Sequence, residues 1–378
     1  MKILFYQLGL NPLEGGVQRV SWTVAQLLIK CGYEIYCAYY CQPLSIISNS
    51  PYKDVVCLSS PNQDSVLSQY ISDNGIDVVI NQCGSDVNRT IQLARIKEKI
   101  PFRLYSFVHI SPTGSRDVLG YRDWRIPKIV IRSILKEILI KLYPYDRSAY
   151  RKIYELSDKV VLLSKRSIPE LLGLIGRSYN DEKLLAIPNP ATYCAQSINI
   201  MANKQKKILV VSRMGDAQKR LLRVLDAWKL MQDILTEWSL IFVGDGTDLP
   251  TYRRIAEKDG LKRIKFHGTQ VPDSYYEESS IFLMTSATEG FGMTLIEAQQ
   301  FGCVPVAMDT YSALHDIIED GVNGVITPSG DINTFANVCI SLASDSEKLN
   351  LIGINAMQSS NRFLSNNIVT QWCSLLEQ

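Results

Sequence analysis

The chain has 378 residues, of which 46% are hydrophobic and 21% are charged, a composition typical of globular proteins. Its 40 lysines and arginines nearly balance its 38 aspartates and glutamates, which argues against a dedicated nucleic-acid-binding protein. Nine cysteines without a CxxC pair, beside only three histidines, indicate reduced thiols and argue against a disulfide framework or a metal cluster.

The first half of the chain alternates short apolar runs with helical patterns. The run that follows Met1-Lys2 indicates a first strand and not a signal peptide, because no cleavage-like region comes after it. Helices are expected between the strands, for example at 18–29 and 85–97. The expected strands are 3–7, 34–39, 78–81, 103–108, 159–163 and 184–187. This alternation predicts a parallel sheet that is covered by helices on both faces.

A change of pattern near position 190 predicts a boundary between two domains. Pro188-Asn189-Pro190 is followed by a polar stretch, and then a second series of strands and helices begins. Its expected strands are 207–211, 239–243, 264–267, 281–284 and 304–307, with helices at 221–231, 249–258 and 293–301. The predicted organisation is a Rossmann-like domain at 1–192, a linker at 193–206, a second Rossmann-like domain at 207–356 and a C-terminal helix at 357–378 that crosses back to the first domain.

The strongest chemical signal is the segment Glu289-Gly290-Phe291-Gly292-Met293-Thr294-Leu295-Ile296-Glu297, which follows a strand and opens a helix. The helix start offers free N–H groups to an anion, and the glycines let a ligand approach the backbone. Glu289 can accept hydrogen bonds from sugar hydroxyls, and Glu297 can bind a ribose diol. An ordinary helix start with two solvated carboxylates is an equally good explanation of this segment taken alone.

A pair of cations forms the second signal. Arg213 ends a strand, and Lys219 stands where the next helix is expected to open, so the two can converge on a pyrophosphate. Solvated surface cations are the ordinary alternative. Their place in the same half as the two glutamates favours the phosphate site, and we expect Lys219 and Glu297 both at a cleft surface.

Two weaker signals lie in the first half. Gly15-Gly16 stands between the first strand and the first helix, where a plain turn explains one glycine better than two. His109 ends the strand 103–108, a position suited to polar contact with a substrate. A lone histidine is more often a satisfied structural residue.

Several nucleotide-binding motifs are absent from the sequence. Gly244-Asp245-Gly246 fails the dinucleotide fingerprint at Leu249 and follows the second strand of its domain instead of the first. The chain has no Walker-A loop and no Asp-x-Asp pair at a plausible cleft position, so neither a metal nor any other cofactor is expected.

With these residues in place, the chain resembles the retaining glycosyltransferases of family 4, the glycosyl transferases group 1, which have the GT-B fold and include enzymes of bacterial surface-polysaccharide synthesis. The matching stretches are VSRMGDAQKRLLRVLDAW, FVGDGTDLPTYRRIAEKDGLKRIKFHG and TSATEGFGMTLIEAQQFGCVPVAMDTYSALHDIIEDGVNGVI. Weaker matches in the first half are EGGVQRV, the strand before His109, VVLLSKR and IPNP. The resemblance implies two doubly wound α/β domains, a nucleotide-sugar donor and transfer with retention that needs no metal.

The resemblance also implies roles for individual residues. The catalytic set would be His109, Arg213, Lys219 and Glu289. The donor-binding set would be Gly15, Gly16, Arg213, Lys219, Gly244, His267, Gly268, Glu289, Gly290, Phe291, Gly292, Met293, Thr294 and Glu297. Arg213 and Lys219 would hold the diphosphate, Glu289 and the backbone of the next three residues the donor sugar, and Glu297 the ribose.

The chain departs from the family pattern in two places. Asn189-Pro190 stands where Asn-Gly is common, and 312–316 replaces a Gly-Gly-x-Pro-Glu stretch. Both changes fall near the expected hinge and donor pocket, so they affect the prediction of which donor is bound more than the prediction of which reaction is catalysed. The expected reaction moves a hexose or N-acetylhexosamine from a nucleotide-diphosphate sugar, for which we expect a UDP-sugar, to a glycan acceptor that can be lipid-linked.

Three other functions fit the sequence less well. A GT-B nucleotide-sugar epimerase would share the diphosphate site and form a new nucleotide sugar without an acceptor. A non-catalytic nucleotide-sugar-binding subunit would not need the complete set of cations and glutamates. A two-domain dehydrogenase would need the missing glycine fingerprint.

The segment 116–152 suggests contact with a membrane surface. It carries ten basic and four acidic residues, and its predicted helix 126–142 has an apolar face opposite a basic one. Trp124 and Tyr143 flank that helix as interfacial anchors would. A core-packed helix with a solvated basic face explains the periodicity equally well. We expect a cytoplasmic protein that associates peripherally with anionic lipid at the inner membrane.

Overall fold

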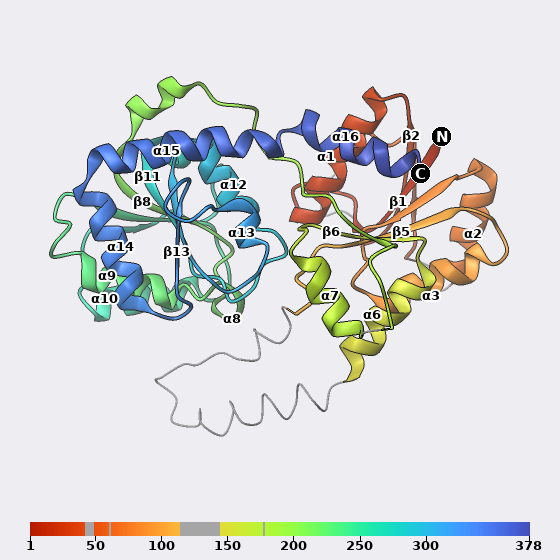
Figure 1. Cartoon of the computed structure of the whole chain (residues 1–378), viewed down its shortest axis with the longest axis horizontal. Helices are drawn as coiled ribbons and strands as arrows, with labels where there is room; N and C mark the ends of the chain where they lie inside the picture. The colour runs from red at the N-terminus through yellow and green to blue at the C-terminus, as the bar shows by residue number, and fades with distance from the viewer. Residues whose placement is uncertain (42–48, 60–61, 114–143, 177) are drawn as a thin grey trace. The chain divides into compact units, whose positions relative to one another are not determined.

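A computed structural model describes residues 1–378 except 42–48, 60–61, 114–143 and 177 (Figure 1). The described residues form two compact units. The first contains 1–113, 144–190 and 365–378, and the second contains 191–364. The predicted helix 126–142 lies outside the described residues, as does most of the basic segment 116–152.

The first unit is built on a parallel sheet whose strand order is β3-β2-β1-β4-β5-β6-β7. Its strands are β1 (Lys2–Gly9), β2 (Glu34–Cys41), β3 (Asp54–Cys57), β4 (Val78–Asn81), β5 (Arg103–Val108), β6 (Lys159–Leu162) and β7 (Leu184–Ala186). Its helices are α1 (Gly16–Lys30), α2 (Gln63–Asn74), α3 (Val87–Lys97), α6 (Pro144–Leu156), α7 (Ser167–Ile175) and α16 (Ser365–Leu376). The order reverses between β1 and β4, which makes the sheet doubly wound.

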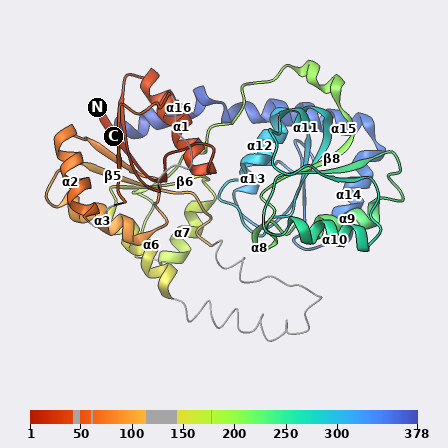
Figure 2. The same cartoon turned by 180° about the vertical axis from the view of Figure 1, so that it is seen from behind.

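The second unit, seen from the other side in Figure 2, repeats this topology with the order β10-β9-β8-β11-β12-β13. Its strands are β8 (Gln205–Val211), β9 (Ser239–Val243), β10 (Ile264–Phe266), β11 (Ser279–Met284), β12 (Val304–Met308) and β13 (Val325–Thr327). Its helices are α8 (Asp216–Lys219), α9 (Leu222–Met231), α10 (Leu249–Lys258), α11 (Asp273–Glu278), α12 (Met293–Gln300), α13 (Leu314–Ile317), α14 (Ile332–Ser344) and α15 (Ser346–Ser360), with 3₁₀ turns η1 (Ile198–Asn203) and η2 (Asn361–Phe363). Here the order reverses between β8 and β11.

The predicted fold class, two doubly wound parallel-sheet domains, is confirmed. Strands β3 and β13 were missed because each is short and carries little apolar alternation: Asp54 and Val55 of β3 are exposed, and β13 has only three residues. The predicted linker 193–206 contains the turn η1 and the first residues of β8.

The C-terminal helix α16 belongs to the core of the first unit although its sequence follows the second. Trp372 of α16 is 3% exposed, and its ring stacks on Phe107 of β5 at 4.4 Å between ring centroids and on Phe5 of β1 at 6.2 Å. Such aromatic contacts add to the free energy of burial and fix the helix on the sheet.

Candidate active site

The candidate residues of the second unit lie on both sides of the point where its strand order reverses. Arg213 follows β8, and Glu289 follows β11, the neighbouring strand in the sheet. In an open α/β sheet, ligands bind outside the carboxyl ends of the strands at such a reversal. The topology therefore places these two loops where a ligand is expected.

Lys219 and Glu289 form an ion pair although 70 residues separate them in the sequence. Lys219 Nζ lies 2.5 Å from Glu289 Oε1, and the two side chains are 18% and 12% exposed. Partial burial strengthens a pair of this kind because water screens it less. The predicted cation and the predicted sugar-binding carboxylate are thus adjacent.

Hydrogen bonds between the two loops hold this pair in place. The amide N–H of Ala287 donates to the carbonyl of Gln218 at 2.7 Å, and Gln218 Nε2 donates to the carbonyl of Thr288 at 3.1 Å. Thr285 Oγ1 donates to the carbonyls of Lys219 and Arg220. The loop after β11 is therefore fastened to the segment that carries Lys219.

Arg213 is exposed and linked to the same segment, since its guanidinium donates to Gln218 Oε1 at 3.1 Å. The prediction that Lys219 opens the helix 221–231 is wrong. Lys219 ends the separate one-turn helix α8, because Arg220 has a left-handed backbone with φ 55° that a right-handed helix cannot continue. The side chain of Arg220 is 2% exposed, whereas that of Lys219 is 18% exposed and pairs with Glu289.

Glycine at position 244 permits the loops after β8 and β9 to run against each other. Gly244 has φ 127°, and a Cβ at this position would lie 1.9 Å from the carbonyl oxygen of Ser212. The amide of Gly244 also donates to the carbonyl of Gly268 at 2.7 Å, which joins the loop after β10. His267, next to it, is exposed, with its ring 5.1 Å from that of Tyr275.

The segment 290–294 leads into α12 by a tight turn. Phe291 is 3% exposed and packs edge-on against Phe363 at 5.6 Å between ring centroids. Its side chain therefore belongs to the core, which leaves its backbone as the part that a ligand could contact. Gly292 caps the helix with φ 101°, and a Cβ there would lie 2.6 Å from Tyr311 Oη. Gly290, Met293 and Thr294 are half-buried.

Glu297 lies in the second turn of α12 and is only 2% exposed, so the prediction of a surface position is wrong. Its Oε1 accepts a hydrogen bond from Thr192 Oγ1 at 2.6 Å, and its Oε2 accepts one from Tyr276 Oη at 2.9 Å. The side chain is buried because this part of α12 packs against α11 and the chain entering from the linker. Two hydroxyl donors compensate the loss of water around the carboxylate.

The candidate residues of the first unit are His109, which follows β5, and Gly15-Gly16, which stand at the start of α1. His109 is half-buried, its Nε2 is hydrogen-bonded to Gln82 Oε1, and its ring stacks on Phe107 at 6.3 Å. Burial lowers the pKa of His109 to about 4, so its imidazole is neutral at pH 7. Gly15 precedes α1 and Gly16 begins it, and packing does not require glycine at position 16, where an added Cβ would meet no atom within 4 Å.

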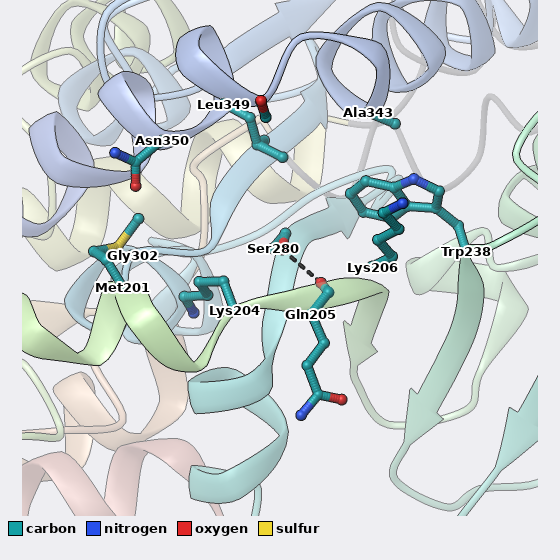
Figure 3. A pocket seen from close by; sticks show the side chains of 11 residues that line it. Met201, Lys204, Gln205, Lys206, Trp238, Ser280, Gly302, Ala343, Leu349 and Asn350 are labelled. Carbon is teal, nitrogen blue, oxygen red and sulfur yellow. Dashed lines mark hydrogen bonds between the residues drawn. The ribbon is translucent and has the colours of Figure 1, made fainter.

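A pocket of about 240 Å³ in the second unit lies away from these loops (Figure 3). It opens at the amino ends of β8 and β11 and is lined by residues such as Met201, Gln205, Trp238, Ser280 and Leu349. The predicted site residues do not line it. The candidate site is thus defined by its polar contacts and by the topology, and not by this pocket.

Sequence reasoning missed several residues that support the site. Thr285 directly follows a predicted strand and could have been noticed there, and Gln218 stands beside Lys219. Thr192 and Tyr276 carry no signal in the sequence, because only the tertiary structure brings them to Glu297.

Among the residues that the structure describes, no group of three His, Cys, Asp or Glu side chains is arranged to hold a metal ion. In the same residues, no helix is both long enough and apolar enough to cross a membrane.

Comparison with known proteins confirms the resemblance to group 1 glycosyltransferases. Residues 196–359 match the family model described as Glycosyl transferases group 1. The amylovoran biosynthesis glycosyltransferase AmsD of Erwinia amylovora is 26% identical over 302 residues, covering 72% of this chain and 82% of that protein. The lipopolysaccharide 1,6-galactosyltransferase of Salmonella typhimurium is 31% identical over 140 residues, covering 35% of this chain and 38% of its own length.

A third relative, the poly(glycerol-phosphate) alpha-glucosyltransferase of Bacillus subtilis, is 26% identical, and the match spans 48% of this chain and 27% of that protein. Among solved structures, Anabaena Alr3699/HepE in complex with UDP and glucose matches with a TM-score of 0.74, 18% identity and full coverage of both chains. Sucrose-phosphate synthase from Thermosynechococcus elongatus matches with a TM-score of 0.78 and 16% identity, covering 100% of this chain and 98% of the other. These likenesses show the GT-B fold.

Proposed function

We propose that this chain, a member of the glycosyl transferases group 1 through its residues 196–359, transfers a sugar from a nucleotide-diphosphate donor to a glycan acceptor. The donor we propose is a UDP-hexose or UDP-N-acetylhexosamine, and the transfer is retaining and independent of metal. The product belongs to the synthesis of a surface polysaccharide.

The ion pair between Lys219 and Glu289 is the observation that supports this proposal best. In a nucleotide sugar, the sugar is bonded directly to the terminal phosphate, so residues that bind these two groups must be neighbours. A cation and a carboxylate 2.5 Å apart, on loops beside the reversal of the strand order, meet that requirement. Lys219 would bind the terminal phosphate, with Arg213 reaching the diphosphate from the loop after β8.

The nucleoside end of the donor would extend toward α12. The N–H groups at the start of this helix favour a negative phosphate, and Glu297 in its second turn would accept hydrogen bonds from the ribose hydroxyls. UDP is favoured as the nucleotide because the solved Alr3699/HepE structure holds UDP and glucose on the same fold.

The chemical step we propose needs no covalent nucleophile from the protein. As the bond between the anomeric carbon and the phosphate oxygen breaks, the acceptor hydroxyl attacks from the same face. The departing diphosphate takes the proton of that hydroxyl. Lys219 and Arg213 stabilise the charge that develops on the diphosphate, which is the term that most reduces the barrier. His109, neutral at pH 7, would hydrogen-bond the sugar.

The acceptor we propose is a glycan that can be lipid-linked, with the enzyme peripheral on the cytoplasmic face of the membrane. The basic excess of 116–152 supports this proposal. The test is binding to anionic vesicles in low salt and release in high salt. Equal binding to neutral and anionic vesicles, or none to either, contradicts it.

A panel of nucleotide sugars tests the donor assignment. A true donor should raise the melting temperature in proportion to occupancy, and UDP-hexoses should lead the panel. The same donor with glycan acceptors should give a product whose anomeric configuration, followed by NMR, matches that of the donor. An inverted product contradicts retention, and a new nucleotide sugar without acceptor identifies an epimerase.

A further inference from the structure

The side chain of Gln218 joins the loops that follow β8 and β11. Its Oε1 accepts a hydrogen bond from Arg213 Nη2 at 3.1 Å, and its Nε2 donates one to the carbonyl of Thr288 at 3.1 Å. Gln218 itself lies in the short helix α8. One side chain therefore links the candidate diphosphate cation to the residue that precedes Glu289.

The orientation of the Gln218 amide is fixed by the chemistry of its two partners. A guanidinium only donates hydrogen bonds and a backbone carbonyl only accepts them, so Oε1 has to face Arg213 and Nε2 has to face Thr288. Turning the amide over would set donor against donor and acceptor against acceptor. The residue is half-buried, and its own carbonyl accepts a bond from the amide of Ala287 at 2.7 Å. The side chain therefore presents a fixed acceptor to Arg213.

Arg213 keeps donors for a ligand while Gln218 holds it. The residue is exposed to solvent, so an anion can reach it. Among the described residues, Gln218 is the hydrogen-bond partner of the guanidinium, and it uses one of several N–H donors. A long side chain that has to be ordered on binding reduces the affinity. A neutral acceptor that already holds the guanidinium lowers this cost and leaves its charge intact.

We infer that Gln218 is a positioning residue that holds the Arg213 guanidinium ready for the diphosphate of the nucleotide, an inference that rests on the proposed function. Gln218 acts through Arg213. A carboxylate at this position would orient Arg213 as well, but it would also compete with the phosphates for the positive charge. A merely structural role would require only that the amide fasten the two loops to each other.

A double-mutant cycle tests whether Gln218 acts through Arg213. Affinities for UDP, ADP and GDP are measured by titration calorimetry, with ligand-observed NMR for weak complexes, and the nucleotide that binds most tightly is used for every variant. We expect Gln218→Met to weaken binding about fivefold, the order of the cost of ordering one long side chain. Arg213→Ala should weaken it about tenfold or more, because a charge-assisted contact is lost. In the Arg213→Ala background, Gln218→Met should change the affinity by less than about twofold.

Gln218→Glu separates the charge at this position from the orientation of Arg213. The carboxylate still accepts from the guanidinium but neutralises it, so this variant should weaken binding more than Gln218→Met does. Both variants keep the backbone bond from Ala287 to position 218 and the bond from Thr285 Oγ1 to the carbonyl of Lys219. The loop after β11 therefore stays attached to α8 in both.

Gln232→Met is the matched control. Gln232 Oε1 also accepts a hydrogen bond, from the amide of Lys262 at 2.7 Å, and thereby joins the end of α9 to the segment before β10. The residue is 7% exposed, so the variant should melt at a lower temperature and still bind the nucleotide as the wild type does. Thermal melts of every variant establish that it is folded at the temperature of the titration.

The outcomes separate the positioning role from the proposed function. Wild-type affinity in a folded Gln218→Met protein, or an equal loss with and without Arg213, overturns the positioning role and leaves the proposed function intact. Binding by Gln218→Glu as tight as that of the wild type overturns it as well, and so does a loss in Gln232→Met equal to that in Gln218→Met. A wild-type protein that binds none of the three nucleotides, or wild-type affinity in Arg213→Ala, overturns the diphosphate assignment and the positioning role with it.

Discussion

The two units present the residues that the sequence singled out in different ways. In the second unit, the loops after β8, β9 and β11 are joined by backbone hydrogen bonds, and they bring Lys219 into contact with Glu289. In the first unit, His109 contacts Gln82 and Phe107, while Gly15-Gly16 stands at the start of α1. These first-unit residues have no contact with each other in the described interactions.

This difference shows what a shared topology does and does not determine. Both sheets reverse their strand order after the first strand of the unit, so both offer a ligand position at the same place. In the second unit this position holds the opposite charges of Lys219 and Glu289. We therefore expect substitutions at the candidate residues of the second unit to alter nucleotide binding and turnover. We expect substitution of His109 to alter chiefly the pH dependence of stability.

The largest effect is expected for Lys219→Ala. Removing the cation that stabilises the leaving diphosphate should lower kcat by about 10²-fold or more. The protein should stay folded, because the ion pair is at a partly exposed loop. Steady-state kinetics with a saturating donor measures the change.

Lys229→Ala provides the matched control for that variant. Lys229 Nζ also pairs with a carboxylate, Asp259 Oδ2, at 3.2 Å, but on an exposed helix surface. This variant should turn over as the wild type does. Wild-type kcat in a folded Lys219→Ala protein would rule out the diphosphate assignment.

The sequence allowed prediction of the features that depend on residues close to one another along the chain. The alternation of strands and helices predicted both sheets, and the order of motifs placed Arg213 and Glu289 after strands and Lys219 at the start of the next helix. The resemblance supplied their roles. The contact between Lys219 and Glu289 was not predicted, because it depends on the pairing of β8 with β11, which brings the loops after these two strands to one edge of the sheet.

The features that escaped prediction depend on tertiary packing or on a single backbone torsion. The burial of Glu297 arises from Thr192 and Tyr276, which are 105 and 21 residues away in the sequence. The end of α8 depends on the left-handed torsion of Arg220, which arginine rarely adopts. Neither could be read from residue types or spacing.

The second largest effect is expected for Glu297→Ala, and it should be on stability as well as on binding. Loss of the carboxylate leaves two buried hydroxyls without their acceptor, which should lower the free energy of unfolding by about 2 kcal/mol. Urea unfolding measures this change. Glu289→Ala, at a partly exposed position, should lower the free energy of unfolding by less. An equal loss in both variants would contradict the view that Glu297 is a buried carboxylate and Glu289 a partly exposed one.

A smaller effect is expected from His109, and it concerns pH. The unfolded chain takes up a proton at this residue near pH 6.5, whereas burial lowers the pKa to about 4 in the folded protein. Stability is therefore complete above pH 6.5 and falls as the pH drops toward 4. Since the ring is partly exposed, we expect His109→Gln to remove about 1 kcal/mol of this fall.

Urea unfolding of both proteins at pH 7 and pH 4.5 provides the measurement. The affinity for a nucleoside diphosphate without sugar should be the same in His109→Gln and in the wild type, which separates this residue from those of the second unit. An identical pH dependence of stability in both proteins would show that His109 does not titrate as its burial requires.

The smallest effect is expected from chelation, which should leave turnover unchanged. The charge of a diphosphate has to be neutralised before it can depart, and the second unit offers Arg213, Lys219 and the N-terminus of α12 for that purpose. EDTA acts on metal ions and not on these groups, so the rate in its presence should equal the rate in buffer. Lys219→Ala sharpens the comparison, because a divalent ion could then substitute for the lost charge and raise the residual rate. Loss of wild-type turnover in EDTA, with recovery on adding Mg²⁺, would mean that the cations of the second unit are insufficient and that the metal-independent mechanism is wrong.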